Sequence, residues 1–413
     1  MISRVSKHSA VGWLIFGLTI KHAAFAAETL KLEVGETAGI KRFGYPIALK
    51  LPELAAGKTD IRFRLRDGDK PVAAQFRQEP GEDGDGRWWL DFNLSLVPHE
   101  VRELILDYGP DVPAAPEPRG LQLSQTPDGF EIRNGTNLTW LMGDDVSALL
   151  KSVDAAGLQH LRPPGVRLGM EGPNGEHIEM TEASSPPRIV RSGPLAVAIR
   201  CSLKSASAPF AEVTSTIDLT FPVSKSWLQV DWRIDDPRKT VRAVEALIAQ
   251  NLTAPTEKEP TLIDFGASSL VYMSLTPGTV GRLQASSAAS DAQSLAKQEW
   301  SVFRGARDRP ELFVSRPSLP NSSDAEGWAH IMDRQRCMAL AVGQFGQAGD
   351  DTIEVTAEGD VRIIRQFASN DIDRPTRKSI QFWLHFVGFP PHVTAATSPQ
   401  SMLSPLTVTV QKR

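Results

Sequence analysis

The sequence predicts an all-β protein in which a small N-terminal barrel is followed by a large two-sheet β-sandwich. From Glu28 onward, apolar residues recur mostly with a period of two, in short runs that Gly, Pro, Asp and Ser interrupt. No long helical pattern occurs after the first 26 residues. Alternation with period two is typical of strands that bury one face, so we expect β-structure along nearly the whole chain.

The clearest expected strand runs from Trp227 to Asp235, where every second residue is apolar. Asp231 and Arg233 share the opposite face with Trp227. A glycine turn at Glu358–Asp360 should join two runs as a hairpin. The other expected strands are residues 60–65, 87–94, 101–107, 195–203, 212–219, 338–344, 352–356, 361–366, 379–387 and 406–410.

A proline-rich segment predicts a domain boundary. Three prolines fall within residues 113–118, where they cannot join a sheet ladder and hold the chain extended. We therefore expect a barrel domain over residues 28–112, a linker over 113–118 and a sandwich over 119–413. Two less regular stretches are expected to be loops, Ser184–Gly193 and Ala285–Pro310, the second with a helical turn around Ala288–Lys297.

The first 26 residues have the pattern of a secretory signal. Arg4 and Lys7 precede an uncharged apolar run from Ala10 to Ile20, and Ala24-Phe25-Ala26 follows as a small-x-small cleavage site. The apolar run is shorter than the roughly twenty residues that cross a bilayer. We expect export, cleavage near Ala26 and a periplasmic or extracellular mature chain.

Charge and motifs exclude several function classes. Removal of the signal changes the formal net charge from −4 to −7. Without a basic cluster, nucleic acid is a poor partner. No metal or nucleotide motif occurs, so no cofactor is expected. An acidic turn at Glu82–Asp85 could bind calcium, although a flexible Gly-Asp turn explains it better. Cys201 and Cys337 could be bridged after export or be buried free thiols.

Several short segments resemble the exo-rhamnogalacturonan lyase-like family. In the first domain these are Tyr45-Pro46-Ile47, the run from Phe63 to Val72 with Gln75, and the run from Gly86 to Phe92 that leads to Tyr108-Gly109. In the next domain they are Gly120-Leu121, Asp128-Gly129-Phe130, Ile132–Gly135, Ser192–Leu195 and the strand at Trp227. The resemblance covers roughly residues 35–240. It implies a barrel followed by a sandwich of the mutarotase and polysaccharide lyase type.

Fuller members of that family are implied to carry a helical toroid after the sandwich, and this chain ends at Arg413 after another β-run. Catalytic residues of such lyases usually lie in a cleft that the toroid helps to form. Lyase activity therefore does not follow from the resemblance.

A repeated Trp-x-His is the most informative local motif. Trp328 and His330, like Trp383 and His385, would share one face of a strand. Indoles stack on sugar rings, and imidazole exchanges protons near neutral pH. Proton removal beside a uronate carboxylate needs a base and a cation. The candidate catalytic residues are His330, Asp333, Arg334, Arg365 and His385, and the candidate substrate-binding residues are Trp328, Trp383 and Trp227.

Each of these residues also has a structural interpretation. Trp383 and His385 lie in a run that is apolar on both faces, which is typical of a core. The face that carries Trp227 could be a solvated outer sheet face with cross-strand ion pairs. Trp88 and Trp89 must point to opposite faces, so at most one of them can be a sugar platform.

Three function classes remain open at this point. A lyase or epimerase requires His330, Asp333, Arg334 and Arg365 to converge in a concave pocket. A binding protein for oligosaccharides, which could contain uronic acids, requires an exposed Trp platform. A structural or partner-docking protein of the cell envelope predicts an exposed apolar patch or an open sheet edge.

Overall fold

The computed structural model describes residues 28–52, 61–79, 87–113, 118–143, 147–180, 183–205, 208–286, 298–316, 323–367, 376–388 and 397–412. Within these ranges almost all regular structure is β-structure, as the period-two pattern predicts. The expected signal at 1–26, most of the proline linker, the helical turn at 288–297 and the acidic turn at 82–85 lie outside the described residues.

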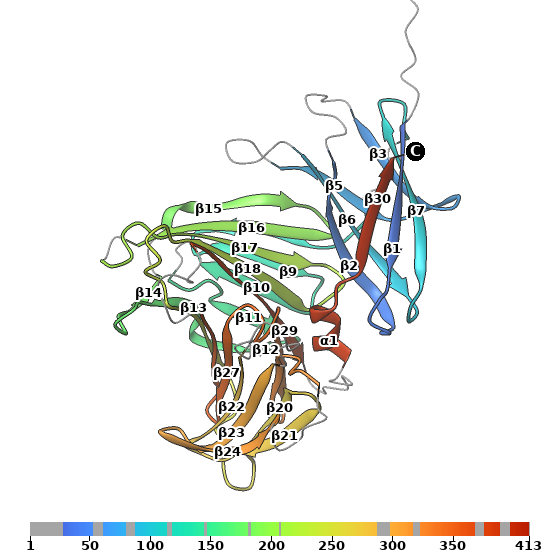
Figure 1. Cartoon of the computed structure of the whole chain (residues 1–413). Helices are drawn as coiled ribbons and strands as arrows, with labels where there is room; N and C mark the ends of the chain where they lie inside the picture. Colours follow the sequence, from blue (N-terminus) through green and yellow to red (C-terminus); the bar gives the residue numbers. More distant parts are fainter. Residues whose placement is uncertain are drawn as a thin grey trace, which may run out of the picture.

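Two sheets form an N-terminal unit around a shared apolar core (Figure 1). Leu32 and Leu104 from one sheet and Leu90 and Phe92 from the other are fully buried there. The first sheet has the order β30 (Thr407–Lys412), β1 (Glu28–Gly35), β7 (Val101–Gly109), β3 (Arg62–Asp67) and β4 (Lys70–Pro71). The second has the order β2 (Arg42–Lys50), β6 (Trp88–Leu96) and β5 (Ala74–Gln78).

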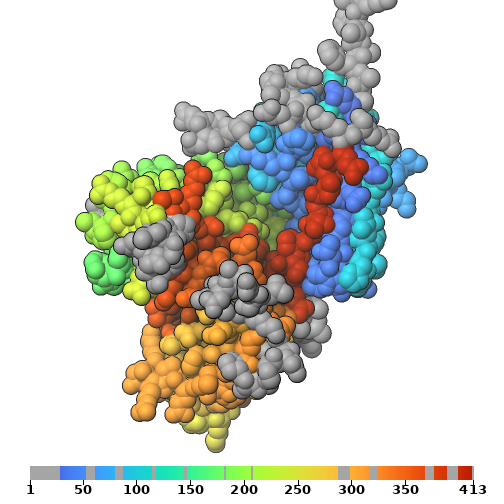
Figure 2. All heavy atoms as spheres, in the orientation of Figure 1, coloured from blue at the N-terminus to red at the C-terminus, as the bar shows by residue number. Residues whose placement is uncertain are grey.

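The C-terminal strand corrects one expected boundary. Residues 119–413 were expected to belong to the sandwich, but β30 pairs antiparallel with β1 over six residue pairs. Figure 2 shows the red atoms of this strand lying against the blue atoms of the first strands. The N-terminal unit is therefore completed by the far end of the chain. The short helix α1 (Thr397–Leu403) leads into β30.

The large sandwich is built from an eight-stranded and a nine-stranded sheet. The eight-stranded sheet has the order β14 (His177–Glu179), β13 (Leu161–Glu171), β19 (Ala243–Gln250), β28 (Asp360–Gln366), β27 (Asp350–Thr356), β22 (Thr279–Ser286), β23 (Glu299–Ala306) and β24 (Arg309–Ser315). The nine-stranded sheet has the order β15 (Ala183–Ser192), β16 (Ala196–Lys204), β17 (Thr214–Pro222), β18 (Trp227–Asp235), β29 (Arg377–Gly388), β26 (Arg336–Val342), β25 (Trp328–Met332), β20 (Thr261–Gly266) and β21 (Leu270–Leu275).

A further five-stranded sheet contributes to the same core. Its order is β12 (Leu158–Gln159), β11 (Ser152–Ala155), β10 (Leu138–Gly143), β9 (Gly129–Asn134) and β8 (Gln122–Thr126). Ile132 and Trp140 of this sheet are fully buried in the same core cluster as Val230 and Trp232 of β18. The inward face of β18 is thus the apolar face that its sequence pattern predicts.

Several local predictions can be compared with the strands. The hairpin at Glu358–Asp360 is confirmed: β27 and β28 pair antiparallel, and Gly359 has a φ of 90°. The loop expected at Ser184–Gly193 is wrong, because β15 occupies it. The loop expected at Ala285–Pro310 is also wrong for most of its described part, where β23 and the start of β24 lie. Cys201 and Cys337 are buried free thiols on separate strands of the nine-stranded sheet.

Candidate functional site

The two Trp-x-His pairs lie on the face of the nine-stranded sheet that is turned away from the sandwich core. Ala339 lies opposite both His330 and His385, and Ala341 lies in the same way between Trp328 and Trp383. The four side chains therefore share one face, as their spacing predicts.

That face is covered by the N-terminal unit. Trp328, Trp383 and Trp227 are 3%, 7% and 4% exposed and belong to the core cluster of that unit. None of the three is the exposed sugar platform that a simple binding surface would require. Their main contribution is apolar contact between the N-terminal unit and the sandwich.

Both histidines have local partners on this covered face. His385 is 2.8 Å from Ser226 Oγ and packs edge-on against Trp227. Burial lowers the pKa of His385 to about 3, so its ring is neutral at physiological pH. His330 is buried against the Trp328 ring, and its Nδ1 atom is 3.8 Å from an Asp264 carboxylate oxygen.

Asp333 and Arg334 lie in the turn between β25 and β26. Burial disfavours the Asp333 carboxylate, but hydrogen bonds from the backbone N–H groups of Thr253, Gln335 and Arg336 outweigh it and lower the pKa of Asp333. Arg334 is exposed and pairs with Glu259. The Asp333 carboxylate holds the turn together, because the Thr253 hydroxyl and Arg336 Nη1 bind it in addition to the backbone donors.

Arg365 belongs to the eight-stranded sheet, on β28. Its guanidinium forms two 2.8 Å bonds to Asp351 and donates to the carbonyl oxygens of Gly343 and Ser379. His330, Asp333, Arg334 and Arg365 are thus held by four separate sets of partners on two sheets. This arrangement does not show the convergence that a lyase or epimerase site requires. The local pattern could not specify which sheet each strand joins.

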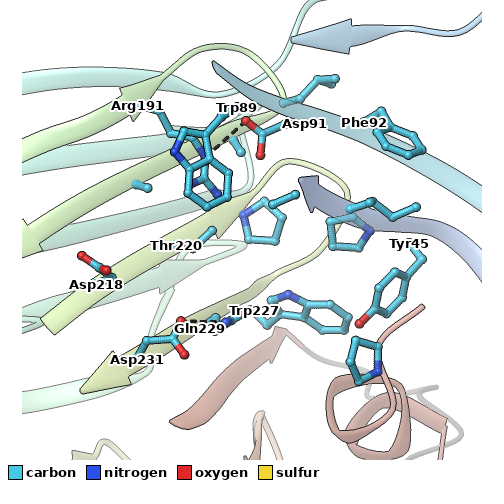
Figure 3. A pocket seen from close by; sticks show the side chains of 18 of the residues that line it. Tyr45, Trp89, Asp91, Phe92, Arg191, Asp218, Thr220, Trp227, Gln229 and Asp231 are labelled. Carbon is cyan, nitrogen blue, oxygen red and sulfur yellow. Dashed lines mark hydrogen bonds and ion pairs between the residues drawn. The ribbon is translucent and has the colours of Figure 1, made fainter. Parts of the chain in front are cut away.

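A different group of residues lines a cavity of about 380 Å³ between the N-terminal unit and the outer face of the nine-stranded sheet (Figure 3). Strands β2 and β6 and the segment after α1 form one wall. Strands β15 to β18 and β29 form the other. The side chains that matter for ligand chemistry are Tyr45, Trp89, Asp91, Arg191, Arg200, Asp218, Trp227, Gln229, Asp231, Gln381 and Trp383.

One end of the cavity holds a buried ion pair across the two units. Arg191 Nε is 3.2 Å from Asp91 Oδ2, and the guanidinium lies 4.3 Å from the centre of the Trp89 ring. Burial raises the pKa of Asp91, although Arg191 counteracts this. Gln75 also donates to Asp91 at 3.2 Å. These contacts lock β6 against β15.

The sheet wall of the cavity has a polar row across strands β16, β17, β18 and β29. The register places Arg200 opposite Asp218, Asp218 opposite Asp231, and Asp231 opposite Gln381. Arg200 binds both oxygens of Asp218, at 2.5 and 2.9 Å. Arg233 also contacts Asp218. Asp218 therefore lies between two guanidinium groups.

Asp231 has a different environment. Gln229 donates to one of its oxygens at 2.7 Å and Gln381 to the other at 2.6 Å. Burial raises the pKa of Asp231, and the two amide hydrogen bonds only partly oppose it. Asp218 and Asp231 are thus neighbours on one sheet face, but guanidinium groups bind Asp218 whereas neutral amides bind Asp231.

Aromatic rings complete the cavity. Trp89 lines it, whereas Trp88 packs against Phe63 inside the N-terminal unit, with ring centroids 4.9 Å apart. The prediction that at most one of these two tryptophans can face a ligand is confirmed. Trp227 and Trp383 form the floor. Tyr45 packs edge-on against Trp227, with ring centroids 6.1 Å apart.

Sequence reasoning identified the Trp227, Asp231 and Arg233 face as a possible glycan surface but missed its partners. Asp91, Arg191 and Asp218 come from three further strands and form no local motif. The sequence signal for each of these three residues is a charged side chain within a strand of alternating apolar residues. That signal is shared by every solvated sheet face.

No group of three or more His, Cys, Asp or Glu side chains in the described ranges could hold a metal ion. None of the helices described is long and apolar enough to cross a membrane.

Comparison with known proteins gives a fold and not a family. No family model matches the chain, and no curated protein matches its sequence. An α-mannosidase structure from Enterococcus faecalis V583 aligns over 93% of this chain and 46% of its own, at 11% identity and a TM-score of 0.56. A glycosyl hydrolase family 38 protein from Enterococcus faecalis aligns over 93% of this chain and 48% of its own, at 11% identity and a TM-score of 0.58.

This chain therefore spans slightly less than half the length of those two proteins. A galactose mutarotase related enzyme from Lactobacillus acidophilus aligns with a TM-score of only 0.37, which is too low to support an argument. The shared feature is a large all-β architecture. Nothing in the comparison singles out the exo-rhamnogalacturonan lyase-like family.

Proposed function

We propose that the protein is a carbohydrate-binding protein whose ligand site is the cavity between the N-terminal unit and the nine-stranded sheet. The observation that supports this most is the combination of indole rings with carboxylate, guanidinium and carboxamide groups around one 380 Å³ space. Such a lining suits a sugar, because rings contact its C–H faces and the polar groups exchange hydrogen bonds with its hydroxyls. The two similar structures are described as carbohydrate enzymes.

A cavity-filling variant tests this proposal. Thr220 lines the cavity, whereas Thr216 points outward from the same face of β17 without lining it. Calorimetric titration against a broad panel of oligosaccharides should show binding to wild type. Thr220→Phe should weaken that binding at least about tenfold by occupying the space, and Thr216→Phe should bind like wild type. Absence of binding to every glycan, or equal binding by both variants, would refute the proposal.

Export belongs to the same proposal and rests on the sequence of residues 1–26. Intact-mass analysis of the protein recovered from the periplasm or medium of an expressing bacterium should give a chain that begins after Ala26. A full-length chain retained in the cytoplasm would contradict export without affecting the glycan site.

A second candidate function is self-association of a structural envelope protein. Leu270 and Tyr272 on β21, and Leu312 and Phe313 on β24, are each more than half exposed. These strands are the edges of the two large sheets, and an open edge can pair with the same edge of a second copy. Sedimentation velocity should then show dimers that Leu312→Lys abolishes. A monomer at all concentrations would exclude this candidate.

A further inference from the structure

Every cation in the described lining of the cavity is already paired with a carboxylate. The lining contains two, Arg191 and Arg200. Arg191 is paired with Asp91, and Arg200 binds both oxygens of Asp218. A uronate ligand would need one of these guanidinium groups to release its partner. The sequence left a uronic-acid ligand open, but both cations of this lining are already paired and the carboxylate of such a ligand would lack a counter-ion.

Asp231 is the carboxylate that the lining leaves without an ion-pair partner. Its two oxygens accept hydrogen bonds only from the neutral side chains of Gln229 and Gln381. The charged groups that act on Asp231 from nearby are Asp218 on β17 and Arg233 on its own strand. Arg233 contacts Asp218, which Arg200 of β16 also binds. Each Asp231 oxygen retains acceptor capacity after one amide bond.

Asp231 lines the cavity, so the remaining acceptor positions of its carboxylate are available to a ligand there. Asp231 follows the floor residue Trp227 by four positions on the same face of β18, with Gln229 between them. Figure 3 shows Asp231 and Gln229 on the sheet wall beside Trp227, with Asp91 and Arg191 on the far side of the space. A ligand lying over Trp227 and Gln229 would bring one substituent next to Asp231.

We propose that the cavity selects amino sugars, with Asp231 as the counter-ion of the ligand ammonium group, and that it disfavours uronates. The inference rests on the proposed glycan-binding function and adds the ligand class. An ammonium donates up to three hydrogen bonds to a carboxylate that has no other cation, and an indole floor also favours a cation. A uronate brings a second negative charge to a partly desolvated carboxylate, which repels it.

The test compares three probes: chitosan oligosaccharides with free amines, fully N-acetylated chitin oligosaccharides, and oligogalacturonides of equal length. Titrations are run near pH 6, which is below the pKa of about 7.7 to 8.0 of an α-amino group, an amine that, like that of an amino sugar, has electron-withdrawing neighbours. Wild type should bind the free-amine oligosaccharide at least about tenfold more tightly than the acetylated one, and the oligogalacturonide most weakly.

Asp231→Asn should bind the free-amine and acetylated probes with similar affinity, because the amide keeps the shape and removes the charge. Asp235→Asn removes the same charge from the same face of β18 at an exposed position outside the cavity, and should keep the wild-type preference. Thr220→Phe should weaken binding of all probes. Attraction of a cationic sugar to the acidic protein as a whole would survive Thr220→Phe, and that result would refute a specific site.

The outcomes separate the two proposals. If wild type binds no sugar, the glycan-binding function itself fails. If wild type binds the oligogalacturonide as tightly as the free-amine probe, or if Asp231→Asn keeps the preference, only the amino-sugar assignment fails. Circular dichroism of each variant establishes that a loss of binding is not a loss of fold.

Discussion

Replacement of Glu36 by glutamine removes a buried charge on which the N-terminal unit and the C-terminal segment both depend. Glu36 is 2% exposed and accepts hydrogen bonds from the backbone N–H groups of Ala38, Gly39 and His99. Arg42 Nη2 binds the same carboxylate at 3.0 Å. A glutamine would keep one acceptor oxygen and place an NH₂ group against the remaining donors.

The consequences extend to the cavity through Arg42. Its guanidinium also donates to the carbonyl oxygens of Ser401 and Ser404 at the end of α1, at 3.1 and 2.6 Å. Leu406, two residues later, lines the cavity. Without the Glu36 charge, a guanidinium that is almost fully buried would have only carbonyl partners.

The expected destabilisation is about 3 kcal/mol. Breaking a buried ion pair by removing one partner costs about 3 to 5 kcal/mol. Backbone and Arg42 hydrogen bonds overcome the effect of burial and lower the pKa of Glu36 from 4.5 to about 2. A shift of that size corresponds to about 3 kcal/mol at neutral pH, so both arguments agree. Because the pKa is lowered on folding, this contribution is present above pH 4.5 and is lost as the pH falls towards 2.

Urea unfolding at pH 7 and at several pH values between 5 and 2 would measure this, with Glu103→Gln as the control. Glu103 forms an exposed pair with Lys31, so its replacement should change stability by less than about 1 kcal/mol. Glu36→Gln should also show a flatter loss of stability in acid than wild type. A change below about 1 kcal/mol at pH 7, or parallel acid profiles, would refute the assignment of Glu36 as the ionised centre of this junction.

Three further outcomes are expected. Asp236→Ala should destabilise the fold by about 3 to 5 kcal/mol in urea titration, because it removes the carboxylate 2.7 Å from the fully buried Lys378 ammonium; a change under about 1 kcal/mol would contradict this. Arg365→Met should lower stability without changing the glycan affinity of the folded protein, and a loss of affinity in a folded variant would return Arg365 to the binding site. Burial raises the pKa of both Cys201 and Cys337 to about 12, so iodoacetamide near pH 8 should leave the native protein unmodified. After denaturation without reductant, the reagent should add two groups. A failure to add them would indicate a disulfide.

Period-two alternation predicts the strands well where one face is buried and the other is wet. The strand expected at Trp227–Asp235 has those bounds in the structure. The rule fails at Ser184–Gly193, where Pro186 and Pro187 and several polar residues resemble a loop. β15 tolerates them because it is an edge strand that pairs only with β16, and its register shifts at three points.

Pairing between distant strands is the part of the fold that local patterns leave undetermined. The final β-run was expected, but its partner β1 lies more than 370 residues earlier in the chain. No alternation of apolar residues in either strand specifies that partner. The assignment of β30 to the N-terminal unit instead depends on the edge that β1 presents, and on Arg42, which fixes the end of α1 just before it.

The same limit explains why spacing assigned the tryptophans correctly to one face but left open whether that face was core or surface. Spacing places Trp328 with His330 and Trp383 with His385, and the register confirms it. Whether that face meets solvent or another unit depends on contacts with strands that spacing does not describe. The N-terminal unit covers the part of the outer face that carries the tryptophans, and it leaves a cavity that Gln229, Asp231 and their polar neighbours line. Each Asp231 oxygen accepts a hydrogen bond from an amide, but no cation among the described residues pairs with this partly buried carboxylate. Because a desolvated charge without a counter-ion is costly, its position beside a cavity supports the proposed ligand ammonium. Asp231, and not the histidines, is therefore the residue at which mutation should separate binding from stability.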